Sequence, residues 1–82
     1  MSAKGENGVD YSYDLVVGRQ IRAAREAKGL TQGQLAARLQ IHNCDITRSA
    51  LAKMEVGQRH IYVAELRALR DILNVPYETL LP

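Results

Sequence analysis

Residues 30–59 of the chain read LTQGQLAARLQIHNCDITRSALAKMEVGQR, and this stretch decides the predicted fold. It contains two short segments of helical character, separated by a polar turn. In the first, Thr31 and Gln34 form a Thr-x-x-Gln capping box, which satisfies the unpaired amides at the start of a helix. Leu35 and Leu39 then fall on one face, as expected for a helix that packs on a core.

The second segment is predicted to be a helix that begins after Thr47, with Asp45 as the alternative N-cap, and ends at Gly57. Its inward stripe consists of Leu51, Met54 and Glu55. The opposite arc carries side chains that can bond to base edges in the major groove of DNA, since Arg binds guanine bidentately and Ser and Lys bind several base or phosphate groups. These side chains are Arg48, Ser49 and Lys53.

The ordered strings G-L-T-Q-x-x-L-A and T-R-S-A-L-A-K-M-E-x-G resemble the lambda repressor and Cro-like family, also called the xenobiotic-response-element family. The resemblance extends over residues 16–81. It implies an all-α domain, a compact bundle of about five short helices that includes a DNA-binding helix-turn-helix. It also implies that Gln32 contacts a phosphate, that the 48, 49 and 53 side chains face the major groove, and that Arg25 and Glu55 form an internal ion pair.

The inward stripe of the preceding helix supports that ion pair independently. Arg25 falls on the apolar face of this predicted helix, and a buried charge without a partner is costly. Glu55, also on an inward stripe, is the natural partner. The alternative is that Arg25 extends past the apolar face to reach solvent.

Phosphate contacts are predicted from both sides of the second helix. Besides Gln32, the first helix of the pair carries Arg38, and the loop after Gly57 carries Gln58 and Arg59. Eight Lys or Arg residues lie between Gly18 and His60 against three acidic residues, although the net charge of the whole chain is only +2. Positive charge is therefore concentrated on the segment expected to meet the DNA backbone.

The turn between the two helices, Gln40–Ile46, is longer than the usual turn of about three to four residues. Either Ile41 or Ile46 can be the apolar residue of the turn. The alignment of this chain with the family is therefore open between the two helices. The extra residues can change the docking angle, touch the DNA backbone or contact a partner. They include Cys44 near His42, which is either a redox or metal switch or, as we favour, a loop thiol without a role.

The composition suits one small domain without an enzymatic or membrane function. The chain has 82 residues, no Phe and no Trp, so its core must be aliphatic. It has no apolar run of about 18 residues and no apolar signal-peptide core, so we expect a cytoplasmic protein. We find no catalytic motif, no metal site and no cofactor or small-molecule effector motif.

Outside the helix pair, residues 1–13 predict a flexible arm, and 14–82 predict the DNA-binding domain. Further helices are expected over about 14–28 and 62–73, with Asn74 as the stop. Pro76 would occupy the first position of a last short helix. The apolar residues near the C-terminus either complete the core or form a dimer seam, and we favour the seam. They are Ile72, Val75, Tyr77, Leu80 and Leu81.

These observations predict a transcriptional regulator that binds specific double-stranded DNA as a homodimer, and we expect a repressor. The alternative is a protein-interaction module, such as an antitoxin or adaptor, built on the same helices.

Overall fold

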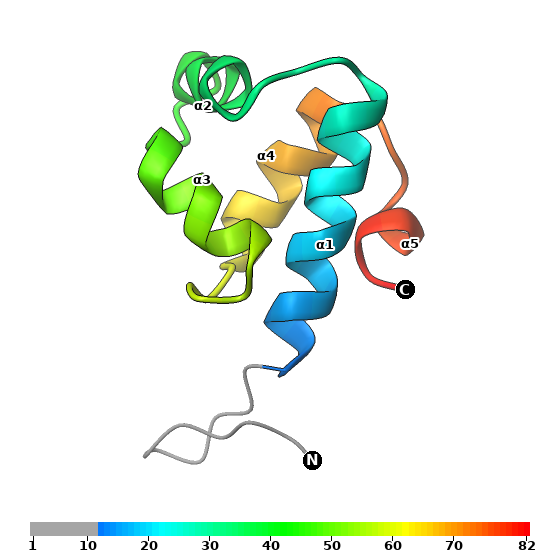
Figure 1. The fold of residues 1–82 in the computed structure, drawn as a ribbon. Helices are drawn as coiled ribbons and strands as arrows, with labels where there is room; N and C mark the ends of the chain where they lie inside the picture. Colours follow the sequence, from blue (N-terminus) through cyan, green and yellow to red (C-terminus); the bar gives the residue numbers. More distant parts are fainter. Residues whose placement is uncertain (1–11) are drawn as a thin grey trace.

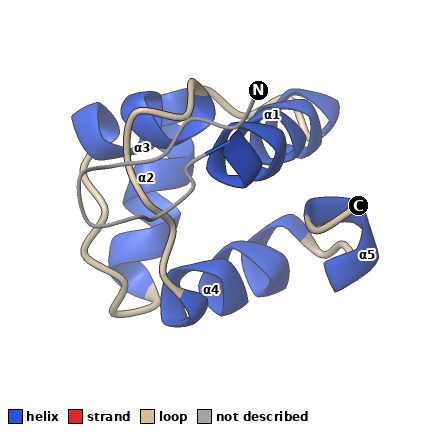
Figure 2. Ribbon diagram, turned by 90° about the horizontal axis from the view of Figure 1, so that it is seen from below, coloured by secondary structure: helices blue, strands red, loops and turns tan. Residues whose placement is uncertain are grey.

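The computed structural model describes residues 12–82, which fold into helices without a strand in that range. The helices are α1 (Ser12–Ala27), α2 (Gln32–Ile41), α3 (Arg48–Glu55), α4 (Val63–Leu73) and α5 (Tyr77–Leu80). Figure 1 shows α2 and α3 on one side of the long α1, with α5 on its other side. The view from below in Figure 2 shows the same separation. The predicted all-α fold of about five short helices is confirmed.

Capping side chains set the ends of the helices. The Thr31 hydroxyl accepts from the Gln34 amide at 3.1 Å, and the Gln34 side chain accepts from the Thr31 amide at 2.9 Å. Thr47, not Asp45, caps α3, and its hydroxyl accepts from the Ala50 amide. Asn74 ends α4 with φ of 53°, a left-handed conformation that Asn tolerates.

Some boundaries differ from the prediction. Helix α2 runs to Ile41, so Gln40 and Ile41 belong to the helix and not to the predicted turn Gln40–Ile46. Helix α1 begins at Ser12, so Ser12 and Tyr13 belong to the helix and not to an arm; the rest of the predicted arm lies outside the described residues. The Tyr13 hydroxyl donates to the carbonyl of Pro82 at 2.9 Å, which links the start of α1 to the end of the chain. Pro76 is the N-cap of α5 and not its first residue.

The core lies between α1 and the other helices. Its largest fully buried side chains are Ile21, Leu35, Leu39, Ile46, Leu51, Met54, Leu69, Leu73 and Leu80. Leu80, one of the predicted dimer contacts, is therefore part of the core of its own chain. Of the other predicted dimer contacts, Ile72, Val75 and Tyr77 are half-buried against this core, and Leu81 is 38% exposed.

Helices α1 and α3 cross at very close range because Gly18 has no side chain. A Cβ atom at Gly18 would collide with the carbonyl oxygen of Met54 and would lie 3.0 Å from its carbonyl carbon. This contact between backbones fixes the position of α3 on α1.

Candidate nucleic-acid interface

The turn between α2 and α3 is anchored by Ile46. This side chain is fully buried, whereas Ile41, at the end of α2, is 80% exposed. Ile46, and not Ile41, is thus the apolar residue of the turn, a choice that the sequence alone did not decide. Asn43 makes the bend possible with a φ of 60°, in the left-handed region that Asn adopts more readily than most residues.

Helix α3 separates a buried side from an exposed side. Leu51, Met54 and Glu55 are buried, and they hold the helix against α1 and α2. The three side chains predicted to read bases, Arg48, Ser49 and Lys53, are all exposed. The helix can therefore meet a partner with these side chains while its packing in the domain stays intact.

Arg48 lies close to the first turn of α2. A Cβ atom at Gly33 would lie 3.8 Å from Cδ of Arg48, an ordinary van der Waals distance. The aliphatic part of Arg48 thus passes beside Gly33, and its side chain stays exposed. Two helices together define where this arginine sits.

A buried ion pair lies directly behind the exposed side of α3. Arg25 Nε and Nη2 donate to Glu55 Oε2 and Oε1 at 2.7 and 2.9 Å, which is the pair expected from the sequence. Arg25 Nη1 also donates to the carbonyl of Leu30 at 2.8 Å. Hydrogen bonding to Glu55 outweighs the cost of burial and raises the pKa of Arg25, so this guanidinium stays charged. The network joins α1, the α1–α2 turn and α3.

Gln32, a predicted phosphate ligand, takes part in this network. Its Nε2 donates to Glu55 Oε1 at 3.1 Å, and the residue is only partly exposed. Its amide therefore already has an acceptor within the domain. The Nε2 amide has a second hydrogen, so Gln32 can keep this bond and still donate to a phosphate.

Arg59, the predicted phosphate clamp, is held by an acid instead. Its Nη1 and Nη2 donate to the two carboxylate oxygens of Glu65 at 2.8 Å each, in bidentate geometry. Burial disfavours ionisation of Glu65, but hydrogen bonds from Arg59 and from the Tyr62 amide outweigh it and lower the pKa of this carboxyl. Arg59 lies in the loop after α3, as predicted, but its partner Glu65 was not predicted. Gln58, the weaker candidate in the same loop, is exposed.

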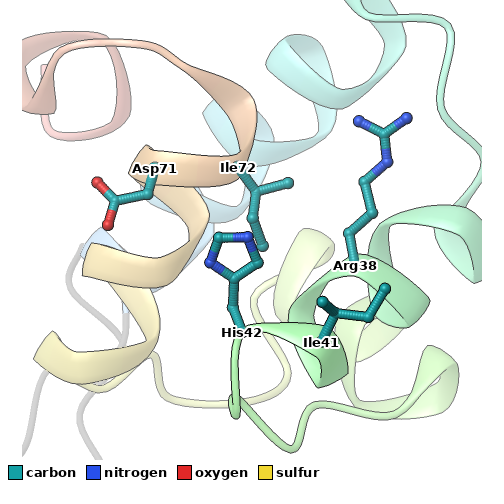
Figure 3. A pocket seen from close by; sticks show the side chains of 5 residues that line it. All are labelled: Arg38, Ile41, His42, Asp71 and Ile72. Carbon is teal, nitrogen blue, oxygen red and sulfur yellow. The ribbon is translucent and has the colours of Figure 1, made fainter.

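Arg38 lies on a different part of the surface. With Ile41 and His42 it lines a pocket of ≈ 260 Å³ whose other side is Asp71 and Ile72 of α4. Figure 3 shows His42, at the end of α2, beside Ile72 of α4, whereas the Arg38 and Asp71 side chains extend in different directions. The pocket contains no residue of α3, so Arg38 is not grouped with the exposed side chains of that helix.

The loop between α3 and α4 is braced by contacts that the sequence reading missed. The buried carboxylate of Asp14 accepts from the Ile61 amide at 3.3 Å, and its other oxygen lies 3.1 Å from His60 Nδ1. Gly57, with φ of 74°, leaves no room for a Cβ atom beside Leu15. No short-range pattern signals contacts between residues more than 40 positions apart.

Cys44 is half-buried in the turn, and burial raises the pKa of its thiol. Across residues 12–82, no cluster of three or more His, Cys, Asp or Glu side chains is placed to hold a metal ion. None of the described helices has the length and apolar character needed to cross a membrane.

Known proteins share this arrangement. A helix-turn-helix family model matches residues 21–80. The restriction-modification controller protein C.AhdI from Aeromonas hydrophila is similar in structure, with a TM-score of 0.74 and 28% identity, covering 85% of this chain and 94% of that one. The DNA-binding domain of BldD has a TM-score of 0.71 and 26% identity, covering 90% of this chain and 100% of that one. The S. venezulae BldD DNA-binding domain has a TM-score of 0.70 and 27% identity, covering 85% and 97%. No curated protein sequence matches the chain.

Proposed function

The chain belongs to the helix-turn-helix family, and from this premise we propose that it binds specific double-stranded DNA as a transcriptional regulator in the cytoplasm. The observation that carries the proposal is the exposed arc of α3. Arg48, Ser49 and Lys53 all reach solvent from a helix whose other side is fixed in the core. The similar structures support it, because they include a controller protein and DNA-binding domains.

In this proposal α3 lies in the major groove and its exposed side chains bond to base edges. Arg48 suits a guanine, to whose O6 and N7 it can donate two parallel bonds. Ser49 and Lys53 contact neighbouring base edges or phosphates. The ion pair of Arg25 and Glu55 keeps the helix rigid, so little conformational entropy is lost when DNA binds.

We propose fewer phosphate contacts than the sequence predicts. Gln32 and Gln58 are the candidates that flank α3, and Gln32 would use the second hydrogen of its amide for a phosphate oxygen while the first stays bonded to Glu55. We assign no phosphate to Arg59, because Glu65 already neutralises it, or to Arg38, because it lies beside α4.

We propose further that the protein binds as a homodimer and represses transcription. Two-fold sites are usual for this motif, with half-sites separated by about 34 Å, one turn of DNA. Leu81 and the partly exposed Ile72, Val75 and Tyr77 offer apolar surface near the C-terminus. Sedimentation of the protein with and without its selected DNA tests the dimer; a footprint on a single, non-repeated half-site contradicts it.

The central experiment is selection of bound DNA from a random pool, followed by affinity measurements at several salt concentrations. Arg48→Ala should weaken the free energy of binding to the selected site by about 1–3 kcal/mol and should remove the preference at one base pair. Arg67→Ala is the matched control, since Arg67 is an exposed arginine on α4 and should leave the preference unchanged. An unaltered base preference in Arg48→Ala would contradict the base-reading role.

The alternative is a protein-interaction module, as in an antitoxin or an adaptor. The pocket between α2 and α4 favours it, because Ile41 stands 80% exposed at its edge. Failure to bind any DNA at low salt would favour this alternative.

A further inference from the structure

One apolar side chain stands on the exposed side of α3. Val56 directly follows the helix and is 52% exposed. It lies three residues after Lys53, four after Ala52 and seven after Ser49. Because residues at these spacings share one helix face, Val56 belongs to the arc that the proposed function places in the major groove.

Packing within the domain does not account for this valine. Among the described residues, it is not one of the partly buried apolar side chains that pack against the core. Val56 therefore presents apolar surface that a bound partner can cover.

Resting on the proposed function, we propose that Val56, together with Ala52, packs against the C5 methyl group of a pyrimidine in the major groove. This methyl is the apolar group that a base pair presents there, and apolar side chains recognise it by contact. The polar side chains on the same arc bond to the polar base edges, whereas Val56 and Ala52 have no side-chain donor or acceptor. Thymine carries the methyl in ordinary DNA, and 5-methylcytosine carries the same group in modified DNA.

The test combines changes in the base with changes in the protein. In a DNA site obtained by selection, each thymine is replaced in turn by deoxyuridine, which lacks only the methyl, and each cytosine by 5-methylcytosine. Dissociation constants are then measured for the wild type, Val56→Ala and Val63→Ala. Val63 is the matched control, because it is an 83% exposed valine that belongs to α4 and not to the exposed side of α3.

For a thymine contact, one deoxyuridine position should weaken wild-type binding about fourfold, the factor for burying one methyl group. Val56→Ala should lose this sensitivity, and Val63→Ala should keep it. For a cytosine contact, replacement of one cytosine by 5-methylcytosine should increase the affinity of the wild type and of Val63→Ala. The affinity of Val56→Ala should stay unchanged.

The inference is overturned if no replacement changes wild-type affinity, or if Val56→Ala keeps the full sensitivity. These results would leave the proposed function standing, because the protein would still bind its selected site. A wild-type protein that binds no DNA would instead refute the proposed function, and this inference with it. Urea denaturation of both variants confirms that they are folded.

Discussion

Replacement of Gly18 by alanine tests whether the close crossing of α1 and α3 fixes the reading helix. The added Cβ would collide with the carbonyl oxygen of Met54 and lie 3.0 and 3.2 Å from the carbonyl carbons of Met54 and Glu55. All three atoms belong to the backbone, so no side-chain rotation can relieve the collision. The two helices must move apart.

The expected effect is the balance of two terms. Alanine in place of glycine inside a helix gains about 1 kcal/mol. Forcing a methyl group into a packed crossing costs about 1–3 kcal/mol and sometimes more, and here the obstacle is rigid. Because the obstacle is backbone, we take the upper end of that cost, about 3 kcal/mol, and subtract the gain of about 1 kcal/mol. The expected net loss is about 2 kcal/mol, or a fall in Tm of about 10 °C for a domain of this size. DNA affinity should fall as well, because α3 is displaced.

Urea and thermal denaturation measure the loss, and Gly33→Ala is the control. Gly33 is also a helical glycine, but a Cβ there meets only Arg48 Cδ at 3.8 Å and Thr31 Oγ1 at 3.9 Å. This variant should be more stable than the wild type by about 0.5–1 kcal/mol. If Gly18→Ala were equally stabilising, the crossing would not hold α3 as described.

Three further predictions concern charges and the thiol. Glu55→Gln leaves the charge of Arg25 buried without its counter-ion and should cost about 3–5 kcal/mol in urea denaturation; a variant as stable as the wild type would contradict the role of the pair. Burial opposes ionisation of Glu65, but the bonds from Arg59 and a backbone amide prevail, so its pKa lies below the ordinary value of about 4.3. The stability from this group is present above about pH 4.3 and is lost as the pH falls through the lowered pKa, so the wild type should lose more stability between about pH 6 and about pH 3 than Glu65→Gln does; equal losses would argue against it. Because burial raises the pKa of the Cys44 thiol, iodoacetamide should modify the native protein more slowly than the urea-unfolded chain at the same pH, and equal rates would show that the thiol is open.

Local chemistry predicts the helix ends closely in this chain. Thr31 and Thr47 were expected as N-caps and Asn74 as the stop of α4, and the structure has each in that position. A cap depends on residues within about three positions of it. Such features are therefore readable from the sequence without knowledge of the tertiary structure.

Partners across the fold are less predictable. The polar groups that engage Arg59 and Gln32 depend on how the loop after α3 and the start of α2 pack. Helical periodicity predicts that Arg38 faces outward. It does not predict that Arg38 lines a pocket together with residues of α4. Ile41 and Ile46, both predicted to lie in the turn, have equal apolar character, and only packing decides which is buried.

Placement of the buried and exposed residues on opposite sides of α3 has an evolutionary consequence. Substitutions at Arg48, Ser49 and Lys53 meet solvent, so they alter few internal contacts and should change the stability of the domain little. Related chains could therefore diverge in target preference by changes at these positions while inheriting the same scaffold. For engineering, a library randomised at these three positions should yield mostly folded members, which makes retargeting a problem of selection rather than of folding.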